Sequence, residues 1–235
     1  MKAFFFDIFG TLVDWRLSII KGARQLDAFK NRLNDLEELV INWRMEYQPI
    51  LRKVNNNIIQ WKTLDELHLI TLEKVLKKMN FIEITEEDKK YLIMLWHKLD
   101  AWSDSCVCIN ELNKKYITAS LSNGNILLQK NLFNHNKLNF DFIFSAEHFK
   151  KYKPNKIVYL GAAEMLNLSV SECVLVASHK SDLSAAAKCG MKTIYVDRKN
   201  EYGNYKNYFQ EKSFNPNLEV SSLKNILHKI KKLAN

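Results

Sequence analysis

Three consecutive phenylalanines near the start of the chain constrain its fold more than any other feature. Phe4, Phe5 and Phe6 lead directly into Asp7. Successive side chains of a strand point to opposite faces of its sheet. The three rings can therefore all be buried only if both faces are covered, as in a parallel sheet. The run predicts a central strand over residues 3–9.

The rest of the chain divides into a helical block and a region in which strands and helices alternate. Between Val13 and Leu99 the apolar spacing is typical of helices, which we expect at residues 16–31, 35–54, 62–79 and 86–98. After Leu99 we expect strands at residues 116–121, 142–144, 174–177, 193–196 and 218–220. We expect further helices at residues 125–133, 154–166, 182–189 and 222–233.

This alternation predicts an α/β fold, a doubly wound parallel sheet with helices on both faces. The core would comprise residues 1–13 and 100–235. The helical block, residues 14–99, would form a cap subdomain inserted after the first strand. Pro154 would open one core helix within its first turn, a position that proline favours. The cap would lie over the carboxyl edge of the sheet, where such folds place their active sites.

Composition limits the classes of protein to which the chain can belong. Only 6 glycines and 3 prolines leave little room for linkers in 235 residues. No run of about 18 uncharged apolar residues is present that would span a membrane. The net charge of +9 is dispersed, so we expect neither nucleic-acid nor membrane binding. The chain shows no export signal and its 4 cysteines lack a CxxC spacing, which indicates reduced thiols in the cytoplasm.

Polar residues follow three of the predicted strands and should meet at the carboxyl edge of the sheet. Asp7, Ser122 and Ser178 occupy these positions. An aspartate is ionised at neutral pH and can act as a nucleophile that forms an ester. Gly10 permits a sharp turn, after which the hydroxyl of Thr11 could fix the angle of the carboxylate. The alternative is that Asp7 only caps a loop.

Two further segments could bind an anion. Ser122 and Asn123 precede a glycine turn and a helix, where free backbone N–H groups bind anions, although a plain helix cap has the same pattern. Lys153 could hold Asp7 and a substrate carboxylate together, since unit charges about 4 Å apart attract by roughly 4 kcal/mol at an effective dielectric of about 20. Its lysine-rich surroundings also fit a surface position. Tyr159, six residues further on, faces either the substrate or the core.

Three more side chains are candidates for a role in the site. Asp182 could orient the lysine or a water molecule, or could simply be a helix N-terminal acid favoured by the dipole. His179 could be a general base because imidazole titrates near neutrality, although a lone loop histidine is commonly structural. Arg44 follows Trp43 in the helical block and could bind an anion, or could be a solvated helix arginine.

Together these segments resemble the L-2-haloacid dehalogenase (type II haloacid dehalogenase) family of the haloacid dehalogenase-like hydrolase superfamily. The resemblance covers essentially the whole core and one motif in the cap: residues 7–14, Trp43-Arg44, residues 121–124, Tyr152-Lys153-Pro154 with Tyr159, and Asp182. It implies a Rossmann-like core and roles for several of the matching residues. In that family the residue that corresponds to Asp7 attacks the halogen-bearing carbon, and the resemblance implies that Thr11 positions Asp7. Arg44, with Asn123 nearby, would bind the halide, and Ser122 and Lys153 the substrate carboxylate.

Two missing acids distinguish the chain from the phosphatases of the same superfamily. Those enzymes carry carboxylates where this chain has Phe9 and Ser178. Magnesium prefers oxygen ligands that include one or two carboxylates, so we expect neither a metal nor another cofactor. Phe9 instead fits an apolar pocket for a carbon–halogen group. Ala177 and His179 stand where well-studied family members carry serine and asparagine, at positions that concern the hydrolytic water.

The predicted reaction is the hydrolytic dehalogenation of a short (S)-2-haloalkanoic acid to an (R)-2-hydroxy acid through an ester on Asp7. Asp182, with His179, would handle the water. A homodimer is expected by analogy with the family. The alternatives are a metal-free hydrolase of this superfamily that acts on a non-halogenated small carboxylic acid, a phosphatase, or a non-catalytic binding protein.

Overall fold

The computed structural model describes residues 1–30 and 32–230, and its centre is a six-stranded parallel sheet. The strand order is β3-β2-β1-β4-β5-β6, so β1 lies inside the sheet as predicted. The strands are β1 (Ala3–Phe6), β2 (Ile117–Ser122), β3 (Phe142–Ser145), β4 (Cys173–Ala177), β5 (Lys192–Val196) and β6 (Leu218–Val220). The predicted α/β class and the doubly wound sheet are confirmed.

The phenylalanine run is divided between the two faces of the sheet. Phe4 and Phe6 belong to one apolar cluster and Phe5 to the other, and all three are fully buried. The first cluster includes side chains of α5 (Ser105–Asn113), α6 (Ile126–Asn136) and α10 (Ile226–Lys229), and the second includes side chains of α8 (Lys156–Met165) and α9 (Lys180–Lys188). Burying one such ring contributes about 1.5–3 kcal/mol. The run therefore anchors both helical layers.

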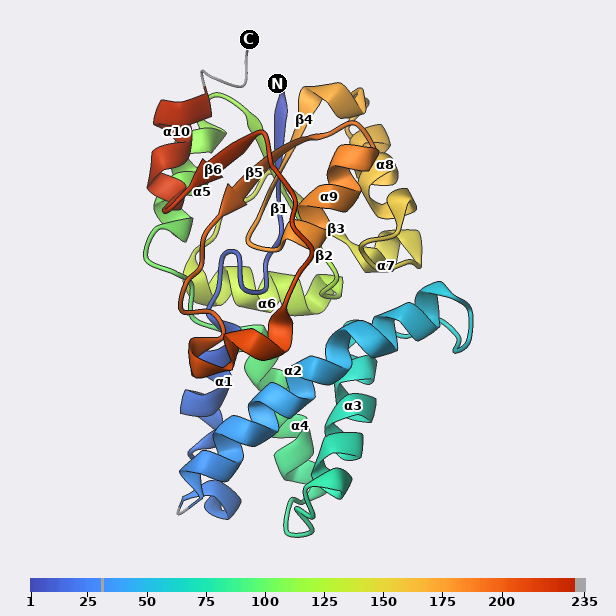
Figure 1. Cartoon of the computed structure of the whole chain (residues 1–235), viewed down its shortest axis with the longest axis vertical. Helices are drawn as coiled ribbons and strands as arrows, with labels where there is room; N and C mark the ends of the chain where they lie inside the picture. The colour runs from blue at the N-terminus through green and yellow to red at the C-terminus, as the bar shows by residue number, and fades with distance from the viewer. Residues whose placement is uncertain (31, 231–235) are drawn as a thin grey trace.

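Four helices gather on one side of the sheet, beneath the carboxyl end of β1 (Figure 1). They are α1 (Trp15–Ala23), α2 (Leu33–Asn55), α3 (Leu64–Lys78) and α4 (Glu86–Leu95). Thr63 and Thr85 each form a capping box, which fixes the starts of α3 and α4. Paired hydrogen bonds tie the end of α2 to the core, since the amide of Asn55 donates to the carbonyl of Tyr152 at 2.9 Å and accepts from its N–H at 2.9 Å.

Several predicted boundaries were wrong. The first strand ends at Phe6 instead of residue 9, because a turn closed by the N–H of Leu12 on the carbonyl of Ile8 follows. The helix predicted at 154–166 begins at Lys156, with Asn155 as its N-cap, so Pro154 precedes the helix. The helix predicted at 16–31 ends at Ala23, and a 3-10 turn, Asp27–Phe29, follows.

Other differences concern short helices. The helix predicted at 86–98 becomes a 3-10 turn at Trp96–Lys98, and the one predicted at 222–233 is a 3-10 turn, Leu223–Asn225, followed by α10. Residues 231–233 of that prediction lie outside the described residues. Four helical segments were not predicted: α5, α7 (Ala146–Phe149) and the 3-10 helices Val170–Glu172 and Gly203–Phe209.

Two composition-based predictions can be compared with the structure. Cys106, Cys108, Cys173 and Cys189 form no disulfide with one another; Cys108 and Cys173 are buried, whereas Cys106 and Cys189 are only partly buried. Across the described part of the chain, no helix has both the length and the apolar character that crossing a membrane requires.

Candidate active site

Asp7 lies directly after β1 and is nearly buried, with 7% of its surface exposed. Thr11 Oγ1 donates a 2.7 Å hydrogen bond to its Oδ2, and Lys153 Nζ lies 2.8 Å from its Oδ1. His179 Nδ1 lies 3.3 Å from Oδ2. Burial raises the pKa of Asp7, but the charges and hydrogen bonds of Lys153 and His179 outweigh burial and hold this pKa far below its ordinary value. The carboxylate is therefore ionised.

The turn after Asp7 brings Thr11 against the end of β4. Gly10 has a φ of +83°, a conformation that residues with a side chain rarely adopt. The N–H of Ser178 donates to Thr11 Oγ1 at 2.9 Å, and Arg198 Nε donates to the carbonyl of Thr11 at 2.9 Å. Thr11, whose hydroxyl contacts Asp7, is thus held through both its side chain and its backbone.

Lys153 is buried between two carboxylates. Its Nζ lies 2.8 Å from Asp7 and 2.5 Å from Asp182 Oδ2, and the hydroxyl of Tyr159 donates to Asp182 Oδ1 at 2.5 Å. Burial lowers the pKa of Lys153, but the charges of Asp182 and Asp7 outweigh it and raise this pKa above its usual range. Burial raises the pKa of Asp182, which the ammonium of Lys153 opposes. Asp182 is therefore paired with the lysine, which is the contact that one of its two predicted roles requires.

The loop after β2 contributes Ser122 and Asn123. Asn123 Oδ1 accepts from the N–H of Lys153 at 2.8 Å, and its Nδ2 donates to the hydroxyl of Tyr47 on α2 at 3.1 Å. Ser122 Oγ accepts from the N–H of Gly124 at 3.0 Å, which leaves its proton available for another acceptor. The asparagine thus fixes the backbone beside Lys153 and links it to the helical block.

Arg44 is buried on α2 and forms no ion pair with any described residue, although its charge helps to lower the pKa of Glu201. Its guanidinium lies 4.3 Å from the ring centroid of Tyr47 and 5.1 Å from that of Trp15. Only 8% of Arg44 is exposed, and Nη1 has no hydrogen-bond partner among the described residues. A buried donor without an acceptor costs free energy. This arrangement is typical of an arginine that binds an anionic ligand.

These side chains surround a cavity of about 710 Å³ between α2 and the carboxyl edge of the sheet. Seven of the residues predicted for the site line it: Asp7, Phe9, Arg44, Asn123, Lys153, His179 and Asp182. The other three, Thr11, Ser122 and Tyr159, are fully buried behind its wall. Tyr159 contacts Asp182 there and packs in the apolar core instead of facing the substrate, which were the two placements that the sequence allowed.

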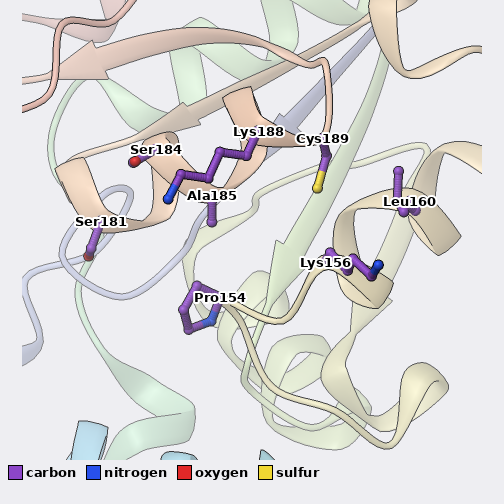
Figure 2. A pocket seen from close by; sticks show the side chains of 8 residues that line it. All are labelled: Pro154, Lys156, Leu160, Ser181, Ser184, Ala185, Lys188 and Cys189. Carbon is purple, nitrogen blue, oxygen red and sulfur yellow. The ribbon is translucent and has the colours of Figure 1, made fainter.

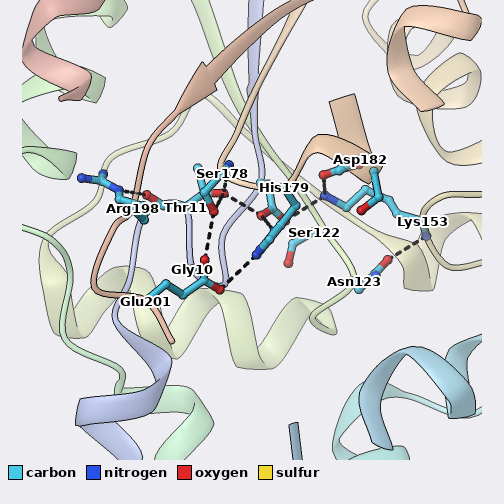
Figure 3. Close-up of polar contacts among 12 residues, drawn as sticks. Gly10, Thr11, Ser122, Asn123, Lys153, Ser178, His179, Asp182, Arg198 and Glu201 are labelled. Carbon is cyan, nitrogen blue, oxygen red and sulfur yellow. Dashed lines mark hydrogen bonds and ion pairs between the residues drawn. The ribbon is translucent and has the colours of Figure 1, made fainter. Parts of the chain in front are cut away.

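Sequence reasoning missed Glu201, a buried acid that follows β5. Its Oε1 lies 3.0 Å from His179 Nε2 and accepts a 3.0 Å hydrogen bond from Trp15 Nε1. Figure 3 shows the contact between Glu201 and His179. Burial raises the pKa of Glu201, but the charge of His179 outweighs this and lowers it. The only signal in the sequence was its position beyond the carboxyl end of a predicted strand.

The environment of Phe9 is aromatic. Its ring meets that of Trp96 edge-on, with 5.6 Å between centroids, and Trp96 in turn stacks on His68. Within residues 1–30 and 32–230, no group of three or more His, Cys, Asp or Glu side chains is arranged to hold a metal ion. Phe9 thus presents an apolar surface to the cavity at one of the positions that distinguish this chain from the phosphatases.

A second cavity, of about 530 Å³, lies between α8 and α9 (Figure 2). Lys156 and Lys188 line it, together with Pro154, Leu160, Ser181, Ser184, Ala185 and Cys189. None of the residues predicted for the site lines this second cavity, so the first cavity is the candidate active site.

Comparison with known proteins identifies the family. A family model for haloacid dehalogenase-like hydrolases matches residues 1–190. The chain therefore belongs to the haloacid dehalogenase-like hydrolase family, which confirms the resemblance found in the sequence.

Curated proteins and solved structures give a finer comparison. (S)-2-haloacid dehalogenase 4A from Burkholderia cepacia is 28% identical over 204 residues, which cover 84% of each chain. A solved L-2-haloacid dehalogenase is 34% identical with a TM-score of 0.91, covering 98% of this chain and 99% of that one. A solved defluorinating L-2-haloacid dehalogenase is 28% identical with a TM-score of 0.90, covering 98% of this chain and 95% of that one.

Proposed function

We propose that the protein is an (S)-2-haloacid dehalogenase that converts short (S)-2-haloalkanoic acids into (R)-2-hydroxy acids. One observation carries the proposal: an ionised Asp7 faces the same cavity as a buried arginine whose Nη1 has no hydrogen-bond partner among the described residues. Displacement of halide by a carboxylate needs a nucleophile on one side of the carbon and an anion acceptor on the other. Asp7 and Arg44 supply these two groups, and the relatives named above have the corresponding activity in their names.

In the first step Asp7 attacks C2 of the substrate. Thr11 and His179 both contact Oδ2, whereas Oδ1 contacts only Lys153 among the described residues. The lone pairs of Oδ1 are therefore the more available, and we assign Oδ1 as the attacking atom. The C2–halogen bond breaks as the C2–O bond forms. The halide leaves toward Arg44, and the configuration at C2 is inverted.

The substrate carboxylate would be held by Lys153 and Ser122. An ammonium has three N–H donors, of which Lys153 uses one on Asp7 and one on Asp182. The third is available to the substrate, as is the hydroxyl proton of Ser122. Tyr159, acting through Asp182, would keep the lysine in position.

In the second step water attacks Cγ of Asp7 in the ester. The bond between Cγ and the ester oxygen breaks, so the C2–O bond survives and the inverted configuration is retained. We further propose that residues 14–99 act as the cap, since Arg44 on α2 lines the same cavity as Asp7 of the core. The four free cysteines favour a reducing compartment such as the cytoplasm.

Halide release from (S)- and (R)-2-chloropropionate tests this function. With EDTA present and no metal added, we expect chloride from the S isomer alone. Asp7→Asn and Asp7→Ala should abolish it, whereas Asp35→Asn, which alters a carboxylate paired with Arg32 at the start of α2, should not. Undiminished chloride release by both Asp7 variants would refute the assignment of the nucleophile.

A further inference from the structure

The histidine beside Asp7 is placed between two carboxylates. His179 Nδ1 lies 3.3 Å from Asp7 Oδ2, and Nε2 lies 3.0 Å from Glu201 Oε1. The imidazole is thus in line between the nucleophile and a second acid. The following inference rests on the proposed function, because it concerns the step in which the Asp7 ester is hydrolysed.

We propose that His179, held by Glu201, is the base that activates the hydrolytic water, and that esterification of Asp7 switches it on. His179 lines the cavity and its Nδ1 faces the carboxyl group that becomes the ester. A water molecule that attacks Cγ must approach this same carboxyl group. Its proton would then be within reach of Nδ1 once Nδ1 has a free lone pair.

In the resting enzyme that lone pair is not free. Burial lowers the pKa of His179, but the charge of Glu201 and the contact with Asp7 outweigh burial and raise this pKa well above its ordinary value. The other groups that face the ring are Tyr202, whose centroid lies 6.5 Å away, and Tyr195. The charge of Arg44 acts on Glu201 from the side of α2. The resting histidine is therefore a cation that donates to both acids.

Formation of the ester removes one of those acids. Asp7 becomes neutral, so the imidazolium loses one of its two anionic partners and the pKa of His179 falls. One proton leaves for the solvent, and the halide leaves with it as the counter-ion. Nδ1 then accepts a proton from water while the hydroxide adds to Cγ.

The remaining transfers return the enzyme to its starting state. The tetrahedral intermediate collapses with cleavage of the Cγ–O bond to the substrate. The departing alkoxide takes the proton from His179 and becomes the 2-hydroxy acid. The regenerated Asp7 carboxyl group then gives its proton to His179, which restores the ion pair. The net reaction consumes one water and releases one halide and one proton.

Two features favour His179 over Asp182 as this base. Each oxygen of Asp182 already accepts a hydrogen bond, one from Lys153 and one from Tyr159. The carboxylate of Glu201, in contrast, fits beside Gly10, where any Cβ would overlap it. Glycine at position 10 thus leaves room for the acid that orients the imidazole. Glu201 is a positioning residue, because it acts through His179.

Rapid-quench kinetics with (S)-2-chloropropionate on wild type, His179→Ala and Glu201→Gln test the inference. We expect each variant to release about one chloride per site in a burst and then to turn over at least ~100-fold more slowly than wild type, the scale of a lost general base. The peptide that contains Asp7 should carry the mass of one propionate. His135→Ala, an exposed histidine on α6, should behave as wild type.

The pH dependence separates a base from a structural residue. The rate at which the ester decays should rise with pH as His179 in the ester form loses its proton. In Glu201→Gln the midpoint of this rise should move to lower pH, since a negative neighbour has been removed. If the Asp7 ester decayed more slowly as the pH rises, His179 would instead donate a proton to the ester oxygen, and the assignment of His179 as the base would be wrong.

The outcomes also distinguish this inference from the proposed function. If wild type releases no halide, the proposed function fails. If wild type turns over but both variants do so at the same rate, or if they lose the burst together with turnover, the function stands and the assignment of the base is wrong.

Discussion

Replacing Arg44 with methionine should abolish dehalogenation while leaving the stability of the fold nearly unchanged. Most buried arginines are held by a carboxylate, so that removing the cation leaves a buried anion unpaired. Arg44 makes no ion pair with any described residue and contacts the faces of Tyr47 and Trp15 instead. Methionine has a similar length and can fill the same apolar space.

The magnitude follows from two opposed contributions. Contact of a cation with an aromatic ring stabilises by about 0.5–2 kcal/mol, and methionine loses this for both rings. A buried donor without a partner costs about 1–3 kcal/mol, and more when it is charged; methionine removes that cost. Losing two ring contacts costs about 1–4 kcal/mol and removing the unpaired donor returns about 1–3 kcal/mol or more, so the two contributions roughly cancel. At the middle of both ranges the net change is within about 1 kcal/mol of zero, which shifts the Tm by at most about 2–4 °C for a chain of this length.

The assay is thermal unfolding in halide-free buffer and in bromide or chloride. Halide bound at Arg44 should raise the Tm of wild type, since a ligand at 100 times its Kd stabilises by about 2.7 kcal/mol. The Arg44→Met variant should show no such increase, and Arg24→Met, at the end of α1, should respond as wild type does. A variant that loses more than about 1 kcal/mol without halide would refute the reasoning, because Arg44 would then already be stabilised in the empty site.

Two further predictions follow from the same cavity. Tyr159→Phe removes a buried hydrogen bond to Asp182 and should lower the free energy of unfolding by about 1.5–3 kcal/mol, the range for bonds to charged groups; an unchanged midpoint in urea would contradict this. The pKa of His179 is higher in the folded than in the unfolded chain. The protonated His179 therefore stabilises the fold fully below the unfolded pKa of ~6.5, and this stabilisation is lost as the pH rises toward the folded pKa. Stability should fall by about 1.4 kcal/mol per pH unit in that window, and His179→Ala should lack this slope in denaturant titrations at several pH values.

Much of the site could be predicted because its residues directly follow strands. In a parallel sheet the carboxyl ends of β1, β2 and β4 meet at one edge. The positions of Asp7, Ser122 and Ser178 relative to the strands therefore implied their proximity before any distance was known. The phenylalanine run placed β1 inside the sheet for an equally local reason, since three adjacent apolar rings need two covered faces.

Other parts of the site depend on contacts that no local pattern records. The sequence allowed Tyr159 to face either the substrate or the core, and only the packing of α8 against α9 places its hydroxyl on Asp182. α5 was missed because Ser105–Asn113 is short and mixes polar with apolar residues. Glu201 lies in a loop, and its burial results from Trp15 and His179, which are distant from it in sequence.

The charges around Asp7 explain why a histidine belongs at position 179. Esterification neutralises Asp7 and leaves the buried cations Lys153, His179 and Arg44 with one negative charge fewer nearby. A buried excess of positive charge is costly. Loss of a proton from one of the cations therefore lowers the electrostatic free energy of the site. Lysine and arginine have ordinary pKa values near 10.4 and above 12, whereas that of histidine is near 6.5. The imidazole is therefore the group that must yield its proton, and Glu201 ensures that the proton returns when Asp7 is restored.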